Sequence, residues 1–204
     1  MLRLLLNGLF ARVTSWIGAS SERLVWSPLV VACRDNVQSA TRIMIVAHPD
    51  DESLFGGEAL TSLKGWMVVC VTNAGVIERR QEFVNAMNLI KANYVMLNHA
   101  DHLASGNFDP SLERQLAELI AERPWEMIVT HGRRGEYGHT QHKAVHQIVC
   151  RLAPRDRIFV FGARWWGRSR ISAAKEQLLA CYQSQESIRR FRYLAGRECL
   201  RALR

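Results

Sequence analysis

The chain has 204 residues, which is enough for one domain with a sizeable core, or for one domain with extensions. Apolar residues make up 48% and charged residues 23%, which excludes a disordered chain, a collagen-like repeat and a polytopic membrane protein. The net charge is +8, and because residues 151–204 hold 13 basic and 4 acidic side chains, the whole excess lies in the last quarter.

Residues 1–39 form an N-terminal extension. Apolar side chains at helical spacing predict an amphipathic helix in it: Leu2, Leu5, Leu6, Leu9, Val13 and Trp16. This run is too short and too polar to span a bilayer. We expect it to dock on the surface of the domain, with a membrane interface as the alternative. Five cysteines without a CxxC pair indicate a reducing compartment, so we expect a cytoplasmic protein, with peripheral membrane contact as the further option.

From residue 40 onward, short apolar runs alternate with helical patterns. The runs predict strands at 42–47, 66–72, 94–97, 127–130 and 157–161. The patterns between them predict helices at 53–64, 78–93, 110–122 and 140–152, and residues 172–203 are expected to form one or two further helices. This alternation predicts one α/β domain over residues 40–204, with a Rossmann-like, mostly parallel sheet and helices on both faces.

Two groups of polar side chains follow the first and fourth predicted strands. His48-Pro49-Asp50-Asp51-Glu52 comes after the first, and His131 with Tyr137-Gly138-His139-Thr140-Gln141-His142 comes after the fourth. Ligands of open α/β sheets bind outside the carboxyl ends of the strands. We therefore expect both groups at one functional edge of the sheet.

The residue types at this edge favour a metal-dependent hydrolase. Three carboxylates within five residues repel one another unless a cation or solvent compensates. A catalytic zinc site needs three protein ligands and an open position, which His48, Asp51 and His142 would provide. Asp50 would then remain free as a general base, and His139 would assist the leaving amine or the oxyanion.

Other interpretations of the same residues stay open at this point. Asp50 or Asp51 would also serve as a helix cap, and His142 as a surface histidine. A second metal set, formed by His139, His142 and His146, would lie on one helical face. The oxygen and nitrogen ligands suit iron or cobalt as well as zinc.

The motifs VAHPDDESLFGGEAL, VVCVTNAG and YGHTQHKAVH together resemble the PIG-L/LmbE-like family of zinc-dependent N-acetylglucosamine de-N-acetylases. The resemblance covers about residues 40–185, including the KEQLLACYQSQ segment, and implies an LmbE-like fold. It implies zinc ligation by His48, Asp51 and His142. From the ligand chemistry alone, Fe²⁺ stays another candidate metal. In the family pattern Asp50 corresponds to the general base, His139 to the histidine that assists collapse of the tetrahedral intermediate, and Tyr137 to an oxyanion contact. Arg79 and Asp101 correspond to substrate contacts.

One position departs from the family pattern. The family often has an aspartate in the second histidine box, whereas this chain has Gln141. An aspartate would orient or charge a neighbouring histidine, and a neutral amide only hydrogen-bonds. We therefore expect the change to affect the protonation of His139.

The sequence thus predicts a metal-dependent enzyme that removes acetyl from an N-acetylated amino sugar and releases acetate. The expected partner is an amino-sugar conjugate, phosphate-bearing or lipid-linked, and no nucleic acid. Arg164, Arg168 and Arg170 flank Trp165-Trp166 and would hold a phosphate; a solvated basic face is the alternative. The competing functions are a metal-dependent phosphoester hydrolase and a non-catalytic module that binds nucleic acid or membranes through its charge.

Overall fold

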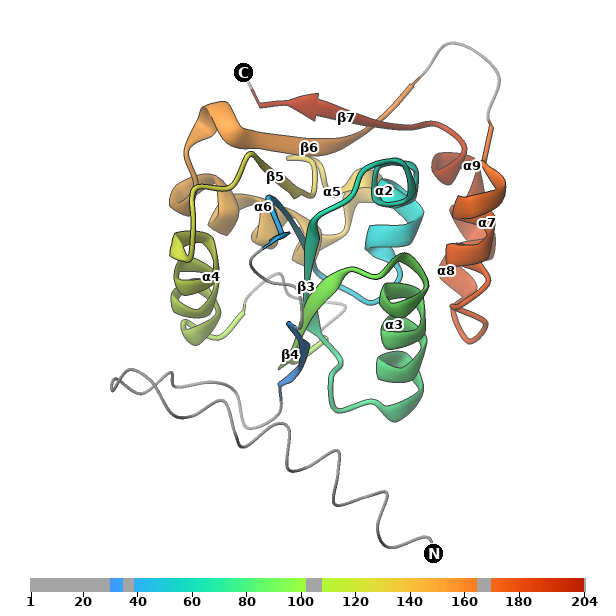
Figure 1. Ribbon diagram of the computed structural model, residues 1–204, viewed down its shortest axis with the longest axis horizontal. Helices are drawn as coiled ribbons and strands as arrows, with labels where there is room; N and C mark the ends of the chain where they lie inside the picture. Colours follow the sequence, from blue (N-terminus) through green and yellow to red (C-terminus); the bar gives the residue numbers. More distant parts are fainter. Residues whose placement is uncertain (1–29, 35–38, 102–107, 165–169, 204) are drawn as a thin grey trace, which may run out of the picture.

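A computed structural model describes residues 30–34, 39–101, 108–164 and 170–203 (Figure 1). In this part of the chain a seven-stranded sheet has the order β1-β4-β3-β2-β5-β6-β7. Its strands are β1 (Val31–Cys33), β2 (Arg42–Val46), β3 (Trp66–Thr72), β4 (Asn93–His99), β5 (Met127–Thr130), β6 (Ile158–Ala163) and β7 (Glu198–Ala202). Strands β2 to β6 pair in parallel, and β1 and β7 close the two edges in antiparallel fashion.

Helices cover both faces of this sheet (Figure 1). One face packs against α2 (Asp51–Ser62), α3 (Ile77–Ile90), α7 (Ala173–Leu179), α8 (Glu186–Arg190) and α9 (Arg192–Ala195). The other packs against α4 (Ser111–Ala121) and α6 (Thr140–Leu152), which follows the short α5 (Gly135–Gly138). A 3-10 turn, η2 (Arg155–Arg157), leads into β6.

The alternation of side chains along the buried strands divides the core into two layers. In β2, Met44 and Val46 join the cluster under α2 and α3, whereas Ile43 and Ile45 join the cluster under α4 and α6. All four are fully buried, as expected for a central parallel strand covered on both faces. The predicted α/β class is therefore confirmed.

The predicted C-terminal helices are wrong in part. Residues 198–202 form the edge strand β7 instead of continuing a helix. This strand is half-exposed and carries Glu198 and Arg201, so it lacks the continuous apolar run that marked the buried strands. Its conformation comes from antiparallel pairing with β6, a long-range contact. In the predicted N-terminal extension, Val31–Cys33 forms β1, and the predicted amphipathic helix lies outside the described residues.

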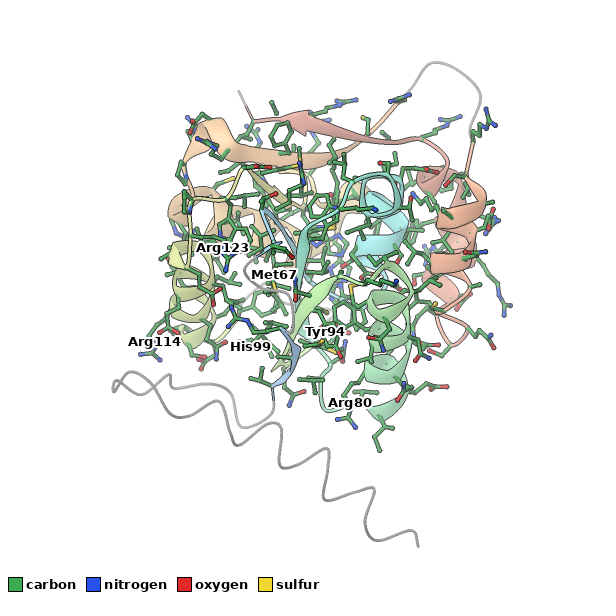
Figure 2. The ribbon with its side chains drawn as sticks, in the orientation of Figure 1. Met67, Arg80, Tyr94, His99, Arg114 and Arg123 are labelled. Atoms are coloured by element: carbon green, nitrogen blue, oxygen red, sulfur yellow. The ribbon has the colours of Figure 1, made fainter. Side chains whose placement is uncertain are left out.

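The strand order places the functional edge at a defined point. From β2 the chain continues to β3, which pairs with one side of β2, whereas β5 pairs with the other side of β2. The direction in which strands are added to the sheet therefore reverses between β2 and β5. Such a switch point leaves a crevice at the carboxyl ends of the two strands. Figure 2 labels two residues near the carboxyl ends of the neighbouring strands: His99, the last residue of β4, and Arg80, on the first turn of the helix α3 that follows β3. No helix in the described part of the chain is long and apolar enough to cross a membrane.

Candidate active site

The chain makes a strained turn between β2 and α2. Asp50 has φ 121° and ψ −28°, a conformation that non-glycine residues rarely adopt and that is typical of functional sites. It occupies the N-cap position of α2, yet its side chain makes no capping hydrogen bond. The backbone N–H of Asp50 instead donates to the carboxylate of Glu52, at 3.1 Å. The cap alternative therefore does not describe Asp50, whose carboxylate is free for other contacts.

Three donor atoms from the two polar groups form a nearly equilateral triangle. His48 Nδ1 lies 3.2 Å from Asp51 Oδ2 and 3.2 Å from His142 Nε2. His142 Nε2 lies 3.2 Å from Asp51 Oδ2. Tetrahedral zinc with bonds of about 2.0–2.1 Å holds its ligand atoms about 3.3–3.4 Å apart. The three residues predicted as metal ligands thus fit a small tetrahedral cation.

The hydrogen bonds behind the triangle direct the lone pairs of both imidazoles into it. His48 Nε2 lies 2.8 Å from Gln141 Oε1, and the Gln141 amide donates to the Ala100 carbonyl, so Oε1 accepts from His48. His142 Nδ1 lies 2.7 Å from Glu136 Oε2 and donates to it. In the neutral imidazoles, His48 Nδ1 and His142 Nε2 are therefore unprotonated and available to a metal.

Charge in the triangle calls for a cation or a proton. Burial alone would lower the pKa of His48, but hydrogen bonds with Asp101 and Asp51 raise it to about 10. The pKa of His142 would also fall on burial, but Asp51 and Glu136 raise it to about 9. Both shifts show that the carboxylates around the triangle favour positive charge on it, which a bound metal ion would also supply.

Glu136 is a site residue that the sequence interpretation missed. Its carboxylate accepts from His142 Nδ1, from His131 Nδ1 at 2.9 Å and from the Gly132 N–H at 2.7 Å. Its backbone is strained, with φ 53° and ψ −70°. Such strain costs about 1–3 kcal/mol and persists where surrounding contacts over-determine it. Three hydrogen bonds to one buried carboxylate provide that constraint, and they fix both imidazoles.

Hydrogen bonds of His131 and His146 argue against two alternative metal sets. The donor atoms of Asp51, His131 and His142 gather within 4.8 Å, but His131 Nε2 accepts the Ala47 N–H at 2.9 Å, so its lone pair is occupied. His146 Nδ1 donates to the His131 carbonyl at 2.8 Å, and neither compact donor group found in the described residues includes this side chain. His139 gathers with His48 and His142, and remains a neighbour of the triangle.

Asp50 precedes the predicted ligand Asp51, and two side chains face one oxygen of its carboxylate. Ser187 Oγ donates to Asp50 Oδ2, and Arg79 Nη2 lies 4.0 Å from the same oxygen. Burial and the charge of Asp51 raise the pKa of Asp50 to about 7, against the opposing effects of Arg79 and Ser187. A carboxyl group with such a pKa can accept and return a proton near neutral pH.

His139 and Tyr137 border the triangle on the side of α5. The His139 ring stacks on His142 with centroids 4.6 Å apart, and its buried Nδ1 has no hydrogen-bond partner in the described part of the chain. Burial and the charges of His48 and His142 lower the pKa of His139 to about 4. The Tyr137 ring packs edge-on against His142 and stacks on Phe191. Burial and nearby carboxylates raise the pKa of Tyr137, so it stays a hydrogen-bond donor at neutral pH.

The structure also brings both predicted substrate contacts to the site. Asp101 Oδ1 lies 3.4 Å from His48 Nε2, and its other oxygen accepts from Asn73 at 3.2 Å. Arg79 donates to the Pro49 carbonyl at 2.6 Å, so its guanidinium braces the turn that carries Asp50. Arg164 and Arg170 are exposed, and Arg164 follows β6, two strands from β2. Arg168 and the Trp165-Trp166 pair lie outside the described residues.

Gln141 contacts His48, and not His139, whose protonation we expected it to affect. We expected its neutral amide to influence His139. The fully buried Gln141 instead contacts His48, as described above. The reason is its place on the first turn of α6, from which its side chain bridges His48 and the carbonyl that follows β4.

Comparison with known proteins gives the family. The PIG-L family, described as GlcNAc-PI de-N-acetylase, matches residues 43–153, which include both histidine boxes and more than half of the chain. The chain belongs to this family. Uncharacterized protein L374 of Acanthamoeba polyphaga mimivirus is 36% identical to this chain in an alignment of 132 residues. The match covers 56% of this chain and 59% of that relative's length.

Two solved structures are similar to this member of the PIG-L family. The conserved protein TT1542 from Thermus thermophilus superposes with a TM-score of 0.58 at 19% identity, over 77% of this chain and 84% of that one. This likeness supports the fold. A deacetylase triple mutant from the teicoplanin biosynthetic pathway gives a TM-score of 0.49 at 14% identity, over 77% of this chain and 82% of that one. The match to the PIG-L family ends before α7. It therefore leaves out Ser187, which contacts Asp50, and Tyr182, whose hydroxyl donates to Glu52.

Proposed function

We propose that this protein is a zinc-dependent N-deacetylase that hydrolyses the acetamide of an N-acetylated amino sugar and releases acetate. The observation that carries the proposal is the triangle of His48 Nδ1, Asp51 Oδ2 and His142 Nε2, with each pair of atoms 3.2 Å apart. Asp50 immediately precedes Asp51 in the strained turn, and the charge of Asp51 acts on its carboxylate. Membership of a family described as a de-N-acetylase supports the reaction class.

The side chains around the triangle have complementary roles in amide hydrolysis. A bound zinc ion would lower the pKa of a water molecule and polarise the amide carbonyl. Asp50 would accept a proton from the attacking water, for which its pKa near 7 is suited. Tyr137 would donate a hydrogen bond to the oxygen that becomes negative, since its raised pKa keeps its hydroxyl protonated.

The proton must then reach the leaving nitrogen. His139 and the protonated Asp50 are the two groups placed to deliver it. The pKa of His139 is lowered to about 4, so it is a weak proton carrier at neutral pH. We therefore assign proton delivery to Asp50, which would act first as base and then as acid, and we assign His139 a hydrogen-bonding role next to the oxyanion.

The substrate we propose is an amino-sugar conjugate with a phosphate or lipid substituent. The support is the basic surplus of the last quarter, part of which is exposed on Arg164 and Arg170 after β6. Arginine side chains bind phosphate in a bidentate manner. Peripheral contact with a membrane through the N-terminal segment and a cytoplasmic location belong to the same proposal.

The decisive experiment pairs metal analysis with product detection. The purified protein is assayed for acetate and for phosphate release over a panel of N-acetylglucosamine conjugates, before and after removal of the metal by a chelator. We expect about one zinc per chain, acetate release, and loss of activity on chelation. Phosphate release without acetate would favour a phosphoester hydrolase. A protein that holds no metal and binds RNA or liposomes in a strongly salt-dependent manner would overturn the proposal.

The general-base assignment has its own test. Asp50→Asn keeps the shape of the side chain but removes its ability to accept a proton. We expect this variant to hold zinc as the wild type does and to lose most of its turnover. Near wild-type acetate release with zinc bound would show that Asp50 is not the base.

A further inference from the structure

The support for Asp50 comes from a part of the chain far away in sequence. Its side chain forgoes the capping hydrogen bond that an N-cap aspartate ordinarily makes to its own helix. Ser187 Oγ on α8, 137 residues further along the chain, donates to Asp50 Oδ2 instead. A flexible carboxylate would otherwise be drawn back to the first turn of α2. The Asp50 carboxylate is thus bound to α8 and makes no hydrogen bond to the first turn of its own helix.

The segment that carries Ser187 is fixed at three places. The Tyr182 hydroxyl donates to Glu52 Oε1 at 2.5 Å, and the other Glu52 oxygen accepts the N–H of Asp50. Ser184 donates to Glu82 on α3 through both its N–H and its hydroxyl, each at 2.8 Å. Ile188, which follows Ser187, is buried in the core under α2 and α3. These contacts hold Ser187 next to the turn between β2 and α2.

We propose that Ser187 is a positioning residue that aims the Asp50 carboxylate for proton transfer. Ser187 and Arg79 both face Asp50 Oδ2, so in this proposal Oδ1 is the oxygen that accepts the proton of the attacking water. Misplacement of a catalytic group by about 1 Å can reduce turnover by about 100-fold. Residues 182–187 therefore complete the site, although they lie beyond the match to the PIG-L family. This inference rests on the proposed deacetylase function.

Three variants test the role of Ser187. Ser187→Ala removes the hydroxyl, Ser187→Thr keeps it, and Ser62→Ala, at an exposed position on α2, is a matched control outside the segment that carries Ser187. For Ser187→Ala we expect kcat to fall about tenfold or more, while KM, bound metal and Tm stay close to wild type. Ser187→Thr should recover kcat to within about threefold of wild type, and Ser62→Ala should keep kcat.

A double-mutant comparison separates positioning from general loosening. In the Asp50→Asn background, Ser187→Ala should cause no further loss of turnover, because the group that it aims is already inactive. An unchanged kcat in Ser187→Ala would overturn the proposal, as would an equal loss in both backgrounds or a failure of Ser187→Thr to recover activity.

A structural measurement remains decisive if the deacetylase proposal itself fails. Absence of acetate release by the wild type over the whole panel would refute the proposed function. Crystal structures of Ser187→Ala and Ser187→Thr would then still show the direction of the Asp50 side chain. We expect the carboxylate to turn toward the first turn of α2 in Ser187→Ala and to keep its direction in Ser187→Thr. An unmoved carboxylate in Ser187→Ala would contradict the role of Ser187.

Discussion

Replacing Glu136 by glutamine should disable the metal site although no metal ligand is changed. The carboxylate of Glu136 accepts three hydrogen bonds, from the Gly132 N–H and from the Nδ1 atoms of His131 and His142. A carboxamide of the same shape has one oxygen and one NH₂ group. If its oxygen stays on the Gly132 N–H, the NH₂ group faces two imidazole N–H groups, and donors oppose donors.

In this orientation of the carboxamide, a change of tautomer relieves the conflict. With Nδ1 turned into an acceptor, His142 carries its proton on Nε2, the atom that belongs to the metal triangle. The protonated Nε2 of His131 would in turn oppose the Ala47 N–H that it now accepts at 2.9 Å. Loss of an outer hydrogen-bond partner of a metal-binding histidine typically costs about 10–100-fold in metal affinity. We expect a loss in this range for Glu136→Gln, or about 1.4–2.8 kcal/mol.

Zinc affinity is measured by competition with a chromophoric chelator, and the electronic spectrum of the Co²⁺-substituted protein reports the ligand geometry. Glu118→Gln, at an exposed position on α4, is the matched control and should bind zinc as the wild type does. Asp50→Asn, which removes a charge next to the triangle but not a hydrogen bond of its histidines, should also retain zinc. If folded Glu136→Gln bound zinc within about threefold of wild type, the tautomer argument built on second-sphere hydrogen bonds would be refuted.

Three further outcomes follow from contacts of the described residues. Gln141→Leu should weaken zinc binding about tenfold in the same competition assay, because His48 Nε2 loses its nearer acceptor and keeps only Asp101 at 3.4 Å. Unchanged zinc affinity would contradict the role of the amide. Below pH 8, zinc affinity should fall about tenfold per pH unit for each proton that zinc displaces, because zinc and protons compete for His48 and His142, whose pKa values are about 10 and 9. Calorimetry in two buffers with different ionisation enthalpies counts the protons released on zinc binding. Release of no proton would contradict this competition. Lys175→Met should lower the free energy of unfolding in urea by about 3–5 kcal/mol, because the buried Glu198 carboxylate loses its ion pair. The double variant Lys175→Met, Glu198→Gln should recover part of this loss. A loss below about 1 kcal/mol in Lys175→Met would contradict the role of the pair.

The sequence was sufficient for the fold and for the convergence of the predicted ligands, for one physical reason. Buried parallel strands leave continuous apolar runs, and their carboxyl ends must meet at one sheet edge. The positions of His48 and His142 after neighbouring strands therefore followed from the order of the elements. The edge strand β7 has no such run, since it is half-exposed and depends on its pairing with β6.

The residues that support the site left a weaker trace in the sequence. Glu136 stands next to the second histidine box, but its importance comes from a strained backbone that turns its carboxylate under two imidazoles. Tyr182 and Ser187 lie 130 and 137 residues from their partners Glu52 and Asp50. No periodic pattern connects positions so far apart. Only the packing of α7 and α8 against α2 and α3 brings them together.

The structure also divides the basic surplus of the last quarter into parts with different consequences. Lys175 is buried and compensated by Glu198, and Arg151 and Arg192 pair with Glu113 and Glu176 on the surface. Arg189 and Arg190 are exposed, and they follow Ser187 on the same short helix. Since Ser187 touches Asp50, these two positive charges lie within one helical turn of a residue in contact with the proposed base. Part of the net charge is therefore local to the site, where it would act on an anionic substrate at short range rather than through the field of the whole molecule.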